Sequence, residues 1–338
     1  MKKMIVVTGG AGYIGSHVVL TLVSQGFDVV IFDNLENGHE EILEALKKIN
    51  GKAINFVRGD LKNPEESDRL FKQYDVDAVM HFAAYINVEE SAKNPSKYYN
   101  NNLIGALNLI TNMVKNNVDK IIFSSTAAIY GQQKYTPIDE LHPKNPVNPY
   151  GHSKLLVEQI LNQYDIAYNL KSVCLRYFNV VGADAKTRIG EWHEPETHLI
   201  PNILAATRNS KNIFQLYGDN YNTKDGTCVR DYLNVEDLAD AHVLALRHLI
   251  NGGASDSFNL GTASGYTIME ILEACEKVIG KKIRIQVNGR RAGDPAVLVA
   301  DNRKATEVLK WTPKRHIEDS VETAYKWLIQ LENRKQFI

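Results

Sequence analysis

Short apolar runs alternate with helix-like patterns through the first half of the chain. The apolar runs lie at residues 5–10, 29–34, 54–60, 78–84, 120–131 and 172–182. Between several of them, hydrophobic residues recur three or four positions apart, as in 12–26, from about 95 to 117, and from 148 onward. Strands that alternate with helices predict a parallel sheet with right-handed crossovers. We therefore expect an α/β fold with a Rossmann-type doubly wound sheet.

This alternation stops near residue 182. Residues 183–233 are polar and irregular, whereas 234–262 return to a helical pattern followed by a strand-like run. The chain is long enough for two domains. We expect a dinucleotide-binding domain from residues 1–182 and 234–262. A smaller, discontinuous α/β domain from 183–233 and 263–338 would carry the substrate.

The segment TGGAGYIG joins the first predicted strand to the first predicted helix. Gly9, Gly12 and Gly15 form GxxGxxG, a variant of the dinucleotide fingerprint, around Tyr13 and Ile14. Glycines allow the tight turn, the close approach of a pyrophosphate and close helix–strand packing. The helix N-terminus then favours the phosphates. The flanking strand and helix make this signal stronger than a lone glycine pattern.

Acidic residues end the second and third predicted strands. Asp33 stands eighteen residues after Gly15, where a carboxylate binds the ribose hydroxyls and repels a 2′-phosphate. No basic residue lies in 34–38 to receive such a phosphate, which favours NAD over NADP. Asp60 is a candidate for the adenine amino group. Ordinary strand-end aspartates are the alternative for both.

Residues 148–161, NPYGHSKLLVEQIL, have the features of a helix start. Asn148 is a good N-cap, and Pro149 suits the first helical position. Tyr150 and Lys154 are four residues apart and so share one face. A buried ammonium beside a phenol would lower the tyrosine pKa and make Tyr150 a usable base. Because YxxxK is common by chance, a surface pair without function is the alternative.

Composition narrows the function only a little. The 338 residues are 44% hydrophobic and 23% charged, with a net charge of −1. This balance gives no reason to expect nucleic acid or an acidic membrane as partner. Three widely spaced cysteines fit a reducing compartment, and no apolar run approaches the length of a membrane span. We expect a cytoplasmic protein.

Several motifs in one order resemble the extended short-chain dehydrogenase/reductase family. They are TGGAGYIG, FDN (32–34), RGDL (58–61), HFAA (81–84), YYNNN (98–102), SSTAAIYG, NPYGHSK, LRYFNVVGA (175–183), LYGDNYNTKDGTCVRDY (216–232) and RRAGDP (290–295). Within this family the chain is most similar to enzymes that epimerise UDP-galactose and UDP-glucose at C4. The resemblance covers nearly the whole chain and implies bound NAD and a UDP-sugar substrate.

The resemblance also implies roles for individual residues. Tyr150 would be the base toward the sugar O4, Lys154 would bind the nicotinamide ribose, and Thr126 would hydrogen-bond O4. The NAD site would further include Gly9, Gly12, Tyr13, Ile14, Gly15, Asp33, Asn34, Asp60, Leu61, Phe82, Ala83, Asn101 and Phe178. The UDP-sugar site would include Asn179, His198, Leu199, Gln215, Tyr217, Arg230, Arg291, Asp294 and Leu298. Leu298 would stand at the gate to the sugar C2 side, or be only a packing residue.

Two positions depart from the family pattern. Ile86 stands where relatives often have a lysine near the NAD pyrophosphate, and His198 where they often have asparagine. The resemblance also implies a homodimer in which the helix after Pro95 and the Tyr150 helix pair as a four-helix bundle.

A metal site is not expected. In HEPETH (193–198) the histidines are five residues apart with Pro195 between them, which does not match the helical H-E-x-x-H zinc motif. Cys174 lies in an apolar strand and is expected in the core.

Three other functions remain open. A nucleotide-sugar 4,6-dehydratase needs an acid and a carboxylate after the threonine, where this chain has Ala127 and Ala128. An epimerase acting on UDP-glucuronate is harder to exclude. A non-catalytic NAD-binding scaffold would tend to lose the tyrosine or the lysine, and both are present.

Overall fold

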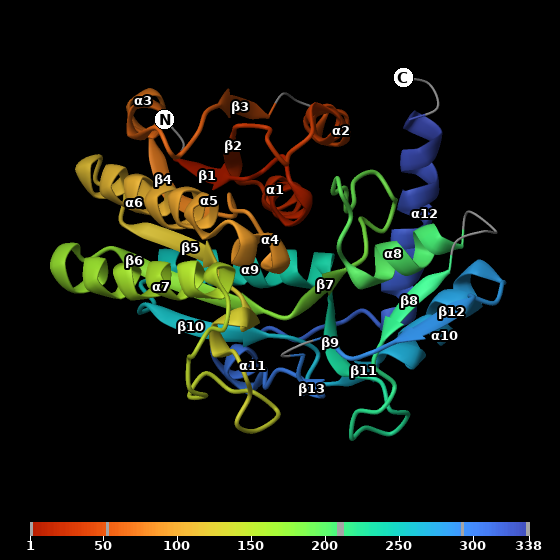
Figure 1. Ribbon diagram of the computed structural model, residues 1–338. Coiled ribbons are helices and arrows are strands. Elements are labelled where there is room, and N and C mark those ends of the chain that lie inside the picture. Colours follow the sequence, from red (N-terminus) through yellow and green to blue (C-terminus); the bar gives the residue numbers. More distant parts are fainter. Residues whose placement is uncertain (1–2, 52–53, 208–212, 292–293, 336–338) are drawn as a thin grey trace.

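A seven-stranded parallel sheet forms the centre of the molecule in the computed structural model, which describes residues 3–51, 54–207, 213–291 and 294–335 (Figure 1). The strand order is β10-β6-β5-β4-β1-β2-β3. The strands are β1 Met4–Thr8, β2 Asp28–Asp33, β3 Asn55–Arg58, β4 Val76–His81, β5 Lys120–Ser124, β6 Lys171–Tyr177 and β10 Asp256–Leu260. The order reverses between β1 and β4, and ligands of doubly wound sheets bind at that point. The expected α/β fold is confirmed.

Helices cover both faces of this sheet. One layer contains α1 Tyr13–Ser24, α2 Glu40–Asn50 and α9 Val235–Ile250, and the other contains α3 Pro64–Gln73, α6 Gly105–Lys115 and α7 Pro149–Tyr168. Successive residues of β1 face opposite layers: Ile5 and Val7 join the first core and Val6 joins the second. Because both faces are buried, the strands are continuous apolar runs. The sequence analysis placed no helix at α2, where only Ile42 and Leu46 are buried.

Two smaller sheets lie beside the large one. A four-stranded sheet has the order β11-β9-β13, with β7 also paired to β9, and a two-stranded sheet pairs β12 with β8. Their strands are β7 Asn179–Val181, β8 Phe214–Tyr217, β9 Val229–Asn234, β11 Gly265–Thr267, β12 Ile285–Asn288 and β13 Val297–Leu298. Helices α8 Leu199–Ala206, α10 Ile268–Ile279 and α12 Ile317–Lys335 share one core with them, and α11 Arg303–Leu309 follows β13.

Two expected strands are shorter than their apolar runs. The run 120–131 leaves the sheet after Ser124, because the Thr126 hydroxyl accepts a bond from the Ala128 amide and starts a 3₁₀ helix, Ala127–Tyr130. The run 172–182 divides into β6 in the large sheet and β7, which pairs with β9. The expected domain boundary at residue 182 therefore falls after a strand of the second sheet.

The expected helix from Pro95 to about residue 117 is also interrupted. A short helix α4 (Val88–Lys93) precedes α5 (Pro95–Tyr98), a π-helix follows at Tyr99–Ile104, and α6 begins only at Gly105. Such π-turns are frequent at functional sites. In the described part of the chain, no helix has both the length and the apolar composition needed to cross a membrane.

Candidate active site

The glycine loop follows β1 and opens α1. Gly9 has a positive φ of 73°, and a Cβ there would lie 2.6 Å from the Ala83 amide nitrogen. A Cβ on Gly15 would lie 2.2 Å from the Gly9 carbonyl oxygen, whereas one on Gly12 would make only a 3.4 Å contact. Packing within the chain thus requires Gly9 and Gly15. It leaves the space at Gly12, in front of the helix N-terminus, for a bound group such as a phosphate.

The carboxylate of Asp33 lies beside this loop. Its oxygens accept hydrogen bonds from the amides of Ala11 (3.0 Å) and Leu35 (2.9 Å), and each oxygen can accept one more. Burial raises the pKa of Asp33, which these bonds oppose. The Asn34 side chain donates to Asp60 at 3.1 Å, so these two predicted residues are brought together next to Leu61.

Phe82 and Ala83 follow β4 and adjoin the glycine loop. The Phe82 amide donates to the Thr8 carbonyl at 2.9 Å. Asn101 lies on the π-helix and donates to Asn102, which in turn holds both backbone groups of Tyr85 at 2.8 and 3.0 Å. These hydrogen bonds hold the π-helix against the segment that follows β4. Tyr13 and Ile14 open α1, and the Tyr13 hydroxyl donates to the Gly182 carbonyl at 2.6 Å.

Tyr150, Thr126 and Lys154 meet where β5 ends. Asn148 caps α7 by accepting from the Gly151 amide at 2.8 Å, which places Tyr150 in the first turn. The Thr126 hydroxyl lies close enough to the Tyr150 phenol to act on its pKa. One turn further along α7, the buried Lys154 ammonium donates to the Ser124 carbonyl at 2.8 Å. The structure thus brings together the three residues expected to be catalytic.

The pKa of Tyr150 differs from the expectation. Burial raises it, and the Thr126 hydroxyl only partly opposes this. Burial also lowers the pKa of Lys154 to about 7, against the opposing effect of Glu158. In the protein by itself, burial is the dominant effect on both pKa values, because it disfavours the charged form of each group.

Sequence reasoning missed two groups beneath this site. The Tyr177 hydroxyl bonds to Ser124, and its raised pKa comes from burial and from nearby Tyr150. Glu158 accepts two bonds from Arg176, at 3.0 and 2.7 Å. Tyr177 is the last residue of β6, which pairs with β5. This strand-end position is the only feature of the sequence that could have predicted its place near the site. A buried ion pair such as Glu158–Arg176 joins residues far apart in sequence and leaves no local pattern.

A cavity of about 190 Å³ lies where β7, α8, β9 and the segment before β13 meet. Among its lining residues are six of the predicted substrate residues: Asn179, His198, Leu199, Arg230, Arg291 and Asp294. Cys228 and Tyr232 also line it and were not expected. Arg230 forms an ion pair with Asp294. Two guanidinium groups at one cavity suit a diphosphate. Ala292 and Gly293 of the RRAGDP motif lie outside the described residues.

The other predicted substrate residues differ in position. The Arg291 guanidinium lies 4.3 Å from the centre of the Tyr217 ring, so Tyr217 adjoins the cavity. Gln215 is exposed on the two-stranded sheet, where it bonds to Gln286 and Asn288, and the structure does not bring it into the cavity. Leu298 packs on an apolar cluster with Phe178 and Ala127, the residue after Thr126. It therefore lies on the catalytic side.

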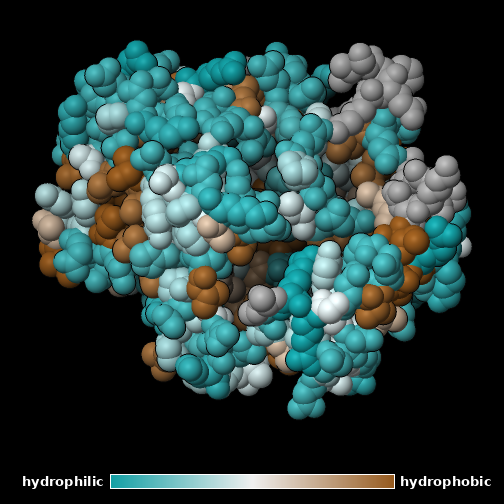
Figure 2. All heavy atoms as spheres, viewed as in Figure 1, coloured by the Kyte–Doolittle hydropathy of each residue, from teal (hydrophilic) through white to brown (hydrophobic). Residues whose placement is uncertain are grey.

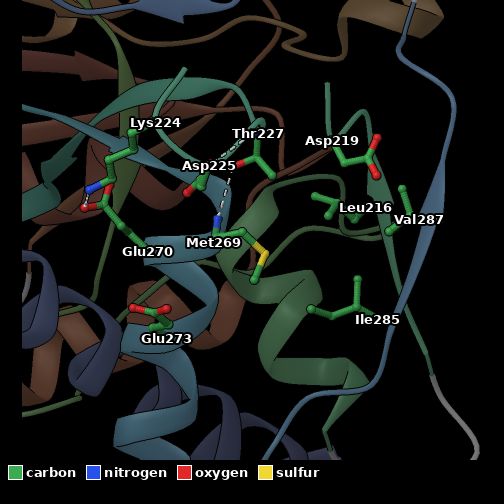
Figure 3. Close-up of a pocket in the computed structure, with 10 residues that line it drawn as sticks. All are labelled: Leu216, Asp219, Lys224, Asp225, Thr227, Met269, Glu270, Glu273, Ile285 and Val287. Carbon is green, nitrogen blue, oxygen red and sulfur yellow. Dashed lines mark hydrogen bonds and ion pairs between the residues drawn. The ribbon is translucent and has the colours of Figure 1, made fainter. Parts of the chain in front are cut away.

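A larger hollow, of about 670 Å³, contains none of the predicted site residues. Leu216, Met269, Ile285 and Val287 form its apolar side, and Asp219, Asp225, Glu270 and Glu273 lie around it (Figure 3). Lys224 is paired with Glu270. Four carboxylates and one paired cation would repel a diphosphate, so the smaller cavity is the better candidate.

The segment before α8 holds a cluster that the sequence analysis did not expect. Glu191, His193, Glu196 and His198 each offer a potential ligand atom, and these atoms lie within 4.8 Å of one another. Burial acts to lower the pKa of both histidines, but Glu191 and Glu196 outweigh it and raise these pKa values to about 9 for His193 and about 10 for His198. His198 thus turns Nδ1 toward carboxylates.

Comparison with known proteins gives matches along the whole chain. The sequence profile of the GDP-mannose 4,6 dehydratase family matches residues 6–324. The UDP-glucose 4-epimerase of Lactobacillus helveticus is 48% identical over 324 residues, 96% of either chain. The UDP-glucose-4-epimerase of Stenotrophomonas maltophila, solved with bound NAD and formylated UDP-arabinopyranose, has a TM-score of 0.95 at 38% identity and covers 98% of this chain and 99% of its own. The UDP-Glc/GlcNAc 4-epimerase of Campylobacter jejuni has a TM-score of 0.86 at 38% identity and covers 97% and 99%.

The family profile includes dehydratases, whereas these full-length relatives are epimerases. A dehydratase needs acidic side chains at positions 127 and 128, where this chain has alanines, so the sequence favours an epimerase. The chain is 48% identical to a UDP-glucose 4-epimerase over nearly its full length, its glycine loop lies at the sheet reversal, and Tyr150, Lys154 and Thr126 lie close together. The chain therefore belongs to the UDP-glucose 4-epimerase family of extended short-chain dehydrogenases/reductases.

Proposed function

We propose that the protein is an NAD-dependent 4-epimerase that interconverts UDP-galactose and UDP-glucose. The observation that carries this proposal is the placement of Tyr150 and Lys154 one turn apart on α7 at the end of β5, with Thr126 beside Tyr150. These groups lie at the carboxyl ends of the strands, as does the glycine loop. The relatives crystallised with NAD and a UDP-sugar support the same assignment.

In this proposal the cofactor lies along the edge where the sheet order reverses. The space at Gly12 receives the pyrophosphate, and Asp33 accepts from the adenosine ribose. Bound NAD takes hydride from the sugar C4 and returns it. Lys154 holds the nicotinamide ribose. The first domain includes the seven-stranded sheet and its helices, and the second holds the diphosphate through Arg230 and Arg291.

Tyr150 performs the proton transfer. Its Oη takes the proton of the sugar O4 as hydride leaves C4, and Thr126 keeps that oxygen in place. The 4-keto sugar then turns in the site, and Tyr150 returns the proton after hydride arrives on the opposite face. Because burial raises the pKa of Tyr150, the phenolate needs the Lys154 ammonium and the cationic nicotinamide beside it. The reaction is redox-neutral, so NAD stays bound.

The test is incubation of the purified protein with UDP-galactose and no added NAD. UDP-glucose should form, and denatured protein should release dinucleotide. A UDP-glucuronate epimerase would leave UDP-galactose unchanged and act on the uronate. A 4,6-dehydratase would release a 4-keto-6-deoxy sugar, and a scaffold would convert nothing. We further propose that the protein is a cytoplasmic homodimer that pairs through α7 and the helices near Pro95.

A further inference from the structure

Four side chains of the loop before α8 converge on one point. They are Glu191, His193, Glu196 and His198, and their potential ligand atoms all lie within 4.8 Å of one another. The segment is not a helix, which explains why the spacing of its histidines did not match a helical zinc motif. The loop returns on itself and brings both carboxylates to both imidazoles.

The carboxylates and imidazoles of this cluster make close ion-pair contacts. Glu191 Oε1 lies 2.6 Å from His198 Nδ1 and 3.3 Å from His193 Nδ1. Glu196 oxygens lie 3.4 Å from His198 Nδ1 and 3.7 Å from His193 Nδ1. Yet Glu191 Oε1 and both Nδ1 atoms are buried and have no hydrogen-bond partner. These three atoms therefore lie close together and have lone pairs available for a ligand.

The separations match those between ligands of a tetrahedral ion. With metal–ligand bonds of about 2.0–2.2 Å, neighbouring ligand atoms lie about 3.4 Å apart. The 3.3 Å between Glu191 Oε1 and His193 Nδ1 and the 3.7 Å between Glu196 Oε2 and His193 Nδ1 bracket this value, whereas Glu191 Oε1 and His198 Nδ1 lie closer, at 2.6 Å. The Glu191 side chain is 6% exposed, so water cannot satisfy its free oxygen.

We propose that Glu191, His193, Glu196 and His198 bind one Zn²⁺ ion per chain. Two imidazoles and two carboxylates are a donor set that zinc accepts, and the two negative charges balance the ion. Neighbouring groups hold the ligands in place. Glu196 Oε1 accepts from the amides of Thr197 and His198, at 2.7 and 2.8 Å, which leaves Oε2 free. The Glu191 carbonyl accepts from Trp327 Nε1 at 2.7 Å.

The ion would have a structural role. Four protein ligands close the coordination sphere, as in structural zinc sites. The His193 ring lies edge-on to Tyr13 of the glycine loop, with ring centres 6.2 Å apart, and His198 lines the 190 Å³ cavity. Zinc would therefore stabilise the conformation of the loop that lies between the candidate cofactor site and the candidate substrate site. The alternative is a metal-free network of protonated histidines and carboxylates.

The test measures metal content in untagged protein, because a histidine tag would bind zinc itself. Protein is dialysed against Zn²⁺, separated by gel filtration and analysed by plasma mass spectrometry. Wild type should retain about one zinc per chain. The variants His193→Asn and Glu196→Gln should retain none. His316→Asn, which changes an exposed histidine outside the cluster, should retain zinc as wild type does.

Two further measurements test the proposal even if a variant fails to fold. Cobalt-loaded wild type should show the intense visible absorption of tetrahedral Co²⁺, and adding zinc should abolish it. A chelator should lower the Tm of wild type by several degrees and leave that of a folded His193→Asn variant unchanged. If wild type retains no zinc, or if cobalt gives only the weak spectrum of an octahedral ion, the cluster is an ion-pair network and the proposal is wrong. Neither result depends on epimerase activity.

Discussion

At the scale of single residues, the glycines before α1 meet different constraints. In Gly15→Ala the new Cβ would lie 2.2 Å from the Gly9 carbonyl oxygen, so the backbone must shift, at a cost of about 1–3 kcal/mol of stability. Gly12 has an extended conformation that any residue adopts, and its Cβ contact of 3.4 Å is nearly ordinary. Gly12→Ala should therefore keep the stability and lose bound NAD. Urea unfolding and dinucleotide released on denaturation measure the two effects. If wild type and Gly12→Ala release equal amounts of NAD, the pyrophosphate does not bind at Gly12.

Tyr150 makes a second prediction at this scale. Tyr150→Phe keeps the ring and removes the hydroxyl beside Thr126. The kcat on UDP-galactose should fall by ~10²–10⁴, the usual contribution of a general base. Thermal unfolding should change little, because the ring remains in place. A kcat within a few-fold of wild type would exclude Tyr150 as the base.

At the scale of elements, strand β13 is placed to influence the choice of sugar. Leu298 is opposite Arg230 in the register of β13 with β9, and packs beside Ala127 and Phe178. It is therefore next to Arg230 of the cavity and shares a cluster with the residue after Thr126. Leucine is smaller than tyrosine but offers an acetamido group no hydrogen bond. A gate of this size changes selectivity by only ~1–3 kcal/mol.

We therefore expect good activity on UDP-galactose and weaker activity on UDP-N-acetylgalactosamine. Leu298→Tyr should abolish the second activity and spare the first, as measured by kcat/KM for both substrates. Val297→Tyr is the control, because the preceding strand residue points to the opposite face. If Leu298→Tyr leaves the ratio of the two activities unchanged, Leu298 is a packing residue only.

At the scale of the whole molecule, an apolar patch lies in the region of α6 and α7, among hydrophilic side chains (Figure 2). Ile104, at the end of the π-helix, is 43% exposed, and Ile166 of α7 is 75% exposed. A face of this kind fits the proposed self-complementary helix pairing in a symmetric dimer. Light scattering at micromolar concentration should give twice the mass of one chain.

Ile166→Glu places a charge on the exposed surface of α7 and should give the mass of a single chain if the dimer contact includes this side of the helix. Val287→Glu on β12, at a position 50% exposed, is the matched control and should leave the mass unchanged. A monomeric wild type would contradict the proposed dimer. A dimeric Ile166→Glu variant would show that Ile166 is not part of the dimer contact.

Features that depend on near neighbours along the chain could be predicted from the sequence. The apolar runs predicted the parallel sheet, the glycine spacing predicted the strand–turn–helix at its reversal, and Asn148 and Pro149 predicted the start of α7. In each case the cause lies within a few residues: backbone conformation, capping or helical periodicity. The shared position of Tyr150 and Lys154 on one helical face followed from their spacing, whereas the role of Thr126 came from the resemblance to a known family.

Contacts between groups far apart in the sequence became visible only in the folded molecule. It moved β7 into the second sheet, left Gln215 on the surface, and brought Glu191 to the histidines of HEPETH. It also reversed the expected direction of the Tyr150 pKa, because burial depends on everything packed around the phenol. Strand partners, ligand sets and pKa values depend on distances between residues far apart in the chain, and no local pattern contains those distances.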